Sequence, residues 1–107
     1  MPRAATFTAT GDLTASANTV IYTASNGVKL KLRLRNANGS GTARTVFVAI
    51  DPTGANTART LAQFLLLDGE ATPPIEVELA NGDALQAWQG TGTDCDYVIH
   101  GFSALFA

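Results

Sequence analysis

The stretch VKLKLRLRN, residues 28–36, decides how this chain folds. Apolar and basic residues alternate in it without a break: Val28, Leu30, Leu32 and Leu34 are interleaved with Lys29, Lys31, Arg33 and Arg35. Successive side chains of a β-strand point to opposite faces, so this pattern predicts a strand with one apolar face and one face of four cations. Four of the seven Lys and Arg residues of the chain lie here. The use of this basic face depends on what surrounds it.

Outward from this strand, alternation and turn signals predict seven or eight short strands, at 5–10, 19–24, 28–35, 45–51, 59–67, 75–80, 83–90 and 96–106. The segment 59–67 also tolerates a helix, but Asp68-Gly69 ends it early, and we expect a strand. Asn26-Gly27 is a strong two-residue hairpin signal, so we expect 19–24 and 28–35 to pair with each other. Many short strands at this spacing predict an all-β fold, an antiparallel β-sandwich of jelly-roll type.

The composition fits one globular domain covering residues 1–107. The hydrophobic fraction of 46% is enough for a core, whereas the charged fraction of 15% is low. Much of the surface is therefore either neutral and polar or covered by another subunit. A net charge of −2 gives no general attraction to nucleic acid or to an anionic membrane.

No segment indicates a membrane span or export. The longest strongly apolar run, residues 64–67, is far too short to cross a bilayer. Residues 1–11 lack the apolar stretch of a secretory signal, and the single cysteine, Cys95, has no internal partner for a disulfide. We therefore expect a protein made in a cytoplasm.

Three interpretations of the basic face compete. A nucleic-acid groove would interleave aromatic residues with the cations, and none are present. Outward lysines also protect a sheet edge against pairing with another chain. The third interpretation uses the strand IEVEL, residues 75–79, in which Glu76 and Glu78 share a face and would pair with the cations, in the same chain or in a neighbouring copy. We favour this third interpretation, in which the cations Lys29, Lys31, Arg33 and Arg35 and the acids Glu76 and Glu78 belong to a docking face.

No group of residues predicts catalysis, a metal site or a cofactor. His100 is the only histidine; it has no evident partner beyond Asp94 or Asp96, and we expect a surface residue with one hydrogen bond. The run TDCDY, residues 93–97, brings two carboxylates together, but calcium sites usually recruit more oxygens from a longer loop, and we expect a polar turn before a strand. The aspartates should raise the pKa of Cys95 and make it a poor nucleophile. Nucleotide-binding glycine motifs are absent.

Aromatic residues are the other candidates for an interface. If Leu85 points into the core, alternation places Trp88 on the outer face beside Gln86, whereas a β-bulge would return Trp88 to the core. An outward Trp flanked by polar groups is typical of sugar-binding surfaces and of protein interfaces. Phe102 and Phe106, near the end of the chain, should be covered by another element or subunit.

The strand and turn residues also resemble a known class of proteins. TVIYTASNG (19–27), RLRN (33–36), LLLDGE (65–70), LANGDALQAW (79–88) and DYVIHGF (96–102) are similar to small virion proteins of tailed bacteriophages. The resemblance implies a β-sandwich that forms an oligomer on the phage particle and has no catalytic residues. It implies a capsid decoration (cement) protein, usually a trimer, that binds the major capsid protein or another virion protein.

Two alternatives remain. One is a structural component of the phage tail or fibre. The other is a carbohydrate-binding module in which Trp88, Tyr22 or Tyr97 stacks on sugar rings.

Overall fold

Eight β-strands and their connections make up the part of the chain that the computed structural model describes, residues 3–25, 27–52 and 59–105, with side chains over 6–25, 27–52 and 59–101. No helix in these ranges is long and apolar enough to cross a membrane. The strands are β1 (Arg3–Asp12), β2 (Val20–Thr23), β3 (Val28–Asn36), β4 (Arg44–Asp51), β5 (Arg59–Leu66), β6 (Ile75–Leu79), β7 (Ala84–Gln89) and β8 (Cys95–Leu105). All eight predicted strands are confirmed, including the ambiguous segment that becomes β5.

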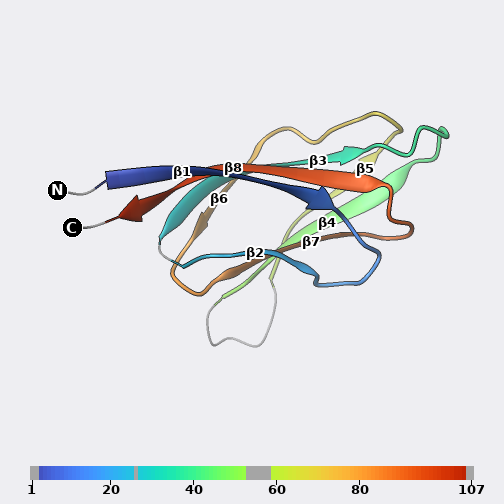
Figure 1. The fold of residues 1–107 in the computed structure, drawn as a ribbon. Helices are drawn as coiled ribbons and strands as arrows, with labels where there is room; N and C mark the ends of the chain where they lie inside the picture. The colour runs from blue at the N-terminus through green and yellow to red at the C-terminus, as the bar shows by residue number, and fades with distance from the viewer. Residues whose placement is uncertain (1–2, 26, 53–58, 106–107) are drawn as a thin grey trace.

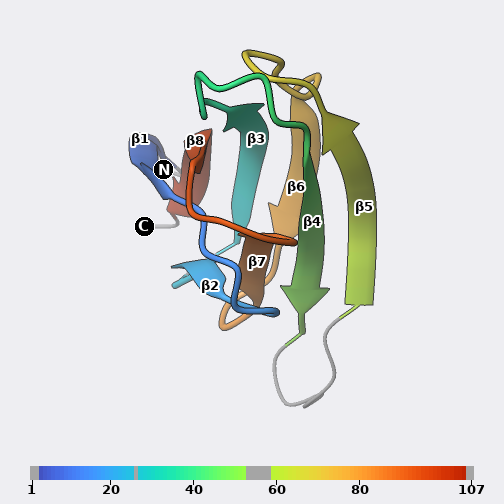
Figure 2. The same cartoon turned by 90° about the vertical axis from the view of Figure 1, so that its right-hand side faces the viewer.

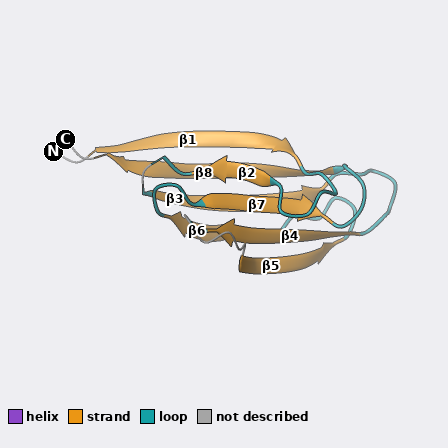
Figure 3. Cartoon of the chain, turned by 90° about the horizontal axis from the view of Figure 1, so that it is seen from below, coloured by secondary structure: helices purple, strands orange, loops and turns teal. Residues whose placement is uncertain are grey.

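The strands form two four-stranded antiparallel sheets that face each other (Figure 1). One sheet has the order β1-β8-β3-β6 and the other the order β2-β7-β4-β5. First pairs with last along the chain: β1 with β8, β2 with β7, β3 with β6 and β4 with β5. This nested pairing is that of an eight-stranded jelly roll, and it confirms the predicted sandwich. Figure 3 shows β1 and β5 at opposite margins of the sandwich.

The predicted hairpin between 19–24 and 28–35 is wrong. β2 pairs with β7 in one sheet, whereas β3 lies between β6 and β8 in the other. Just after β2, the buried Ala24 donates its N–H to the carbonyl of Asp83 and accepts a hydrogen bond from Gly82. These long-range bonds hold the chain against the β6–β7 turn, so it crosses to the other sheet before β3 begins. Tertiary pairing has overridden the local turn signal.

The core lies between the sheets and follows the alternation of β3. Its four apolar side chains are at most 3% exposed, and its cations point to solvent. The β2-β7-β4-β5 sheet packs against these apolar side chains with every second residue of its own strands. Fully buried residues of the two sheets include Leu32, Leu34, Val46, Val48, Leu85 and Ile99.

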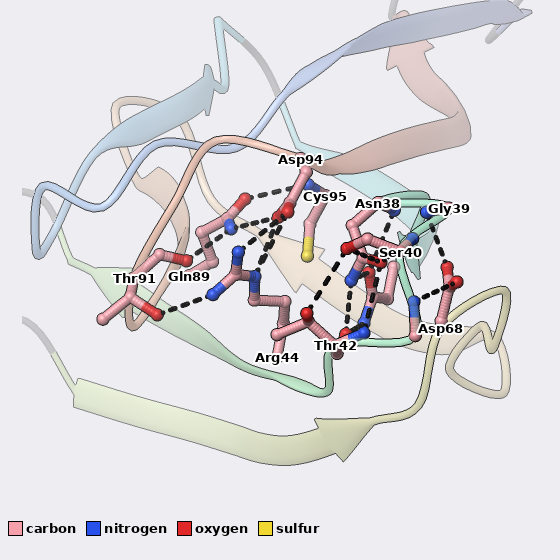
Figure 4. Close-up of polar contacts among 12 residues, drawn as sticks. Asn38, Gly39, Ser40, Thr42, Arg44, Asp68, Gln89, Thr91, Asp94 and Cys95 are labelled. Carbon is pink, nitrogen blue, oxygen red and sulfur yellow. Dashed lines mark hydrogen bonds and ion pairs between the residues drawn. The ribbon is translucent and has the colours of Figure 1, made fainter.

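A polar junction closes one end of the sandwich, and Asn36 lies at its centre. Its side chain is completely buried, and its amide donates to the carbonyls of Thr42 (2.8 Å) and Leu66 (3.0 Å). The Asp68 carboxylate accepts hydrogen bonds from the N–H groups of Gly39 and Gly41, both at 2.9 Å (Figure 4). These bonds attach the β3–β4 turn to the end of β5 and satisfy polar groups that would be costly to bury unpaired.

Gly101 allows the β1-β8-β3 part of the first sheet to pack closely. It lies opposite Phe7 on β1 and Leu30 on β3. A Cβ placed on Gly101 would come within 2.8 Å of the Phe7 ring and of the Leu30 Cβ. Phe7 in turn stacks on Tyr22 of the other sheet, with ring centroids 5.0 Å apart. The missing side chain at Gly101 leaves the space that this contact between the sheets needs.

We expect Gly101→Ala to lower the free energy of unfolding by about 1–3 kcal/mol, because the added methyl group overpacks the core. Urea unfolding followed by tryptophan fluorescence measures the change. Gly27→Ala is the matched control, since a Cβ added at Gly27 would have no other atom within 4 Å of it. Equal midpoints for the two variants would contradict this account of Gly101.

Candidate functional site

The outer face of the β1-β8-β3-β6 sheet is charged, and its cations are paired within the chain. Lys29 lies directly opposite Glu78, and Lys31 lies opposite Glu76. The ammonium-to-carboxylate distances are 3.5 and 4.0 Å, and all four side chains are well exposed. The prediction that cations and acids share one face is therefore confirmed, with the partner in the same chain. Because such exposed pairs add little stability, their main effect is on strand register and surface charge.

The two arginines of β3 differ from each other. Arg35 forms an ion pair with Asp96 of β8 at 3.0 Å. Arg33 donates from Nε to the carbonyl of Thr72 at 3.3 Å and, among the described residues, has no carboxylate within ion-pair distance. Three of the four cations thus have an acidic partner in the described part of the chain, and Arg33 does not.

His100 lies on this charged face as an ordinary surface residue. The sheet register places it between Thr8 of β1 and Lys31 of β3. Its Nδ1 is 3.4 Å from the Thr8 hydroxyl, and the side chain is exposed. The prediction of a surface histidine with one hydrogen bond is confirmed. Two hollows border His100 on this face, and both are partly open to solvent.

The run TDCDY does not gather its polar groups at one point. Asp94 lies at the end of the sandwich, and its carboxylate accepts hydrogen bonds from Nε and Nη2 of Arg44 at 3.0–3.2 Å (Figure 4). Asp96 points to the outer face and pairs with Arg35. Cys95, between them, is buried in the core. Among the described residues, no group of three or more His, Cys, Asp or Glu side chains is arranged to hold a metal ion.

Hydrogen bonding and burial explain the pKa shifts in this segment. The hydrogen bonds from Arg44, and then from Gln89, lower the pKa of Asp94, and the Asp94 carboxylate raises the pKa of Arg44. The pKa of Cys95 is raised to about 11, first by burial and then by the charge of Asp94. The sequence predicted the direction for Cys95 but named only the second cause.

Gln89 is a structural residue whose role the sequence analysis missed. It is completely buried, and its amide donates to the Thr91 carbonyl at 2.7 Å and to Asp94 at 2.8 Å. Its Oε1 accepts the N–H of Cys95 at 2.9 Å. Gln89 therefore ties the β7–β8 turn together from inside the core (Figure 4). The sequence feature that could have predicted this role is a glutamine at a core-facing position of an alternating strand.

Trp88 lies on the outer face of the β2-β7-β4-β5 sheet. This is the arrangement that strand alternation predicted, and not the one in which a bulge returns Trp88 to the core. The pairing of β7 with β4 runs without a register shift, which rules out the bulge. Trp88 is half-buried and stacks on Phe47 of β4, with ring centroids 5.3 Å apart and an interplanar angle of 13°. Its neighbour Gln86 is buried and accepts a hydrogen bond from Asn18 at 2.9 Å. One face of the indole is therefore already covered within the chain.

Large apolar side chains extend this surface toward β5. Leu61, Leu65 and Leu67 are 42%, 67% and 60% exposed, and Val20 on the opposite edge strand is 50% exposed. The strand predicted at 59–67 is confirmed, but its position at the edge of a sheet, where leucines are exposed, was not predicted. The two outer faces of the sandwich therefore differ, one charged and one largely apolar.

The prediction that Phe102 and Phe106 are covered by another element or subunit is not tested by the described residues. The backbone of Phe102 lies in β8, opposite Thr6 and Lys29. The side chain of Phe102 and all of Phe106 lie outside the described residues. Their expected role as covered residues stays a prediction.

Folding should be coupled to pH through Asp94. Its pKa is lower in the folded chain, so its contribution to stability is present above the ordinary pKa of an aspartate, about 3.9, and is lost as the pH falls through the folded value. We expect the stability difference between the wild type and Asp94→Asn to shrink as the pH falls from neutral to below that range. Urea unfolding at several pH values measures it. Asp12→Asn, an exposed carboxylate on β1, is the control and should show a smaller difference at neutral pH; equal behaviour of both variants would contradict the role given to Arg44 and Gln89.

Comparison with known proteins supports the fold. No family model and no curated protein sequence matches the chain. A solved protein of Bacillus endospore appendages, which form a family of disulfide-linked pili, has a similar fold, with a TM-score of 0.58. The similarity covers 98% of this chain and 89% of the other at 13% sequence identity. At that identity the similarity shows a shared fold alone.

Proposed function

We propose that this chain is a non-enzymatic structural subunit of a large assembly, and specifically a capsid decoration protein of a tailed bacteriophage. The observation that carries the proposal is the contrast between the two outer faces of the jelly roll. One face is charged but mostly neutralised within the chain, and the other exposes leucines beside the Phe47–Trp88 stack. Apolar surface of this kind marks a contact with another protein.

The engagement of the reactive side chains also favours a structural role. The Asp94 carboxylate is held by Arg44 and Gln89, and the Cys95 thiol is buried with a raised pKa. His100 makes its hydrogen bond to Thr8 and is separated along β8 from these groups. A catalytic site needs a base beside a nucleophile or acid that it can reach, so the engagement and separation of these side chains favour a structural role.

Attachment to a shell would work through several weak contacts at once. Each copy offers a small surface, and assembly of copies turns the later contacts into intramolecular ones, so the attachment becomes durable. Arg33, the β3 cation without an acidic partner among the described residues, is the best candidate for a charge contact with an acidic capsid surface. Such clamping would resist expansion of a shell filled with DNA.

A second candidate is a subunit of a tail, fibre or pilus-like filament. The fold shared with the endospore appendage protein favours it. The pili of that protein are disulfide-linked, whereas the single cysteine of this chain, Cys95, is fully buried. A filament of this chain would therefore be held together by noncovalent contacts.

We expect the purified protein to co-sediment with empty heads made from the major capsid protein encoded in the same gene cluster. Arg33→Glu should weaken this binding by about tenfold, because it replaces an attraction to the shell by a repulsion. Asp12→Asn, on the same outer face, is the control and should bind at least as well as the wild type. Heads that retain no wild-type protein, together with retention on purified tails or filaments, would contradict decoration and favour the second candidate.

A further inference from the structure

We infer that a second copy of this chain pairs with the free edge of β5, antiparallel and about a two-fold axis, so that two β2-β7-β4-β5 sheets become one continuous sheet. The inference rests on the proposed assembly role and adds the contact surface and the partner. Among the strands that the structure describes, β5 is the outermost of its sheet, with β4 on one side only (Figure 2).

The four edge strands are not equally protected against such pairing. Natural sheets protect their edges with short strands, bulges, prolines and outward charges. β6 has five residues, carries Glu76 and Glu78 on its outer face, and follows Pro73-Pro74. β2 has only four residues, half the length of β5. Both strands therefore carry recognised protection.

The remaining two edges are long, and only one of them is polar. β1 exposes Thr8, Thr10 and Asp12 on its outer face. β5 has eight residues, carries no charge after Arg59, and exposes Leu61 and Leu65. Its register with β4 shifts between Val48 and Ala49, next to Leu61, so its regular stretch is residues 62–66. A long, uncharged edge strand with exposed leucines would make a soluble protein aggregate unless a partner covers it.

A second copy fits this edge because the strand is complementary to itself. An antiparallel pair centred on Gln63 places Leu61 opposite the partner's Leu65, and Leu65 opposite the partner's Leu61. Directly opposed residues lie on the same face of a sheet, so all four leucines fall on one face and contact each other across the axis. The absence of charge from Thr60 to Leu66 means that two identical edges do not repel.

Other edges of a second copy fit less well. Pairing β5 with β1 would oppose leucines with threonines and Asp12, and pairing it with β6 would oppose them with glutamates. Such head-to-tail contacts also leave one edge open at each end of the assembly, whereas the two-fold contact closes. The inference therefore predicts a dimer as the basic unit in solution, in place of the trimer that the resemblance to phage proteins implies.

Cysteine cross-linking tests the geometry directly. Gln63→Cys places two thiols opposite each other at the axis, and we expect a short bis-maleimide to convert most of the protein into a covalent dimer. Val20→Cys is the matched control, an exposed position on the other edge strand of the same sheet, and should remain largely uncross-linked. The native Cys95 is buried with a pKa of about 11 and should not react. Cross-linking of Gln63→Cys no faster than of Val20→Cys would overturn the inference.

The mass in solution tests the energetics. Leu65→Lys should weaken the dimer by about a hundredfold, because each dimer buries the new charge twice, whereas Val20→Lys should leave it unchanged. Sedimentation equilibrium measures both. A wild-type monomer at all concentrations, or a trimer that survives Leu65→Lys, would contradict the β5 contact. Either result leaves the proposed attachment to a shell to be decided separately by co-sedimentation with heads.

Discussion

The alternation of β3 is the constraint on which the rest of the structure depends. β3 is hydrogen-bonded on both sides, to β8 and to β6, so its register fixes three of the four strands in its sheet. Its apolar side chains fill the space between the sheets, and its cations can only face outward. A slip of one residue would bury four charges at a large cost, since no Asp or Glu of the described residues is buried in the core to pair with them. The acids of β6 and β8 then pair with three of those cations, Lys29, Lys31 and Arg35, on the outer face.

Local pattern predicted the strands and their faces, because both depend on the side-chain period along a single segment. It failed for the predicted hairpin between 19–24 and 28–35, because β2 and β3 belong to different sheets. A turn motif indicates that the chain bends, but it does not determine which strands pair with each other after the bend. In this fold, β2 pairs with β7, and Ala24 is hydrogen-bonded to the β6–β7 turn. Both partners lie about sixty residues further along the chain. Nested long-range pairing of this kind cannot be predicted from a short segment of the sequence.

The same reason separates the surfaces that could be predicted from those that could not. The pairing of Lys29 and Lys31 with glutamates followed from two alternating strands of opposite charge. The buried amides of Asn36 and Gln89 were visible as polar residues at core-facing positions, but their hydrogen-bond partners come from turns that only the fold brings together. The leucines of β5 looked like core residues because their exposure depends on β5 being an edge strand.

The two faces of the sandwich thus have different physical roles in this account: the charged face is balanced within the chain, and the apolar edge of the other sheet holds copies together. The salt dependence of self-association tests this division most directly. Raising the ionic strength from about 0.01 M to about 1 M shortens the Debye length from about 30 Å to about 3 Å and weakens contacts between exposed charges. The account predicts that the molecular mass from sedimentation equilibrium stays that of the dimer across this range. Dissociation at high salt would contradict it and would assign the contact to the cations of β3.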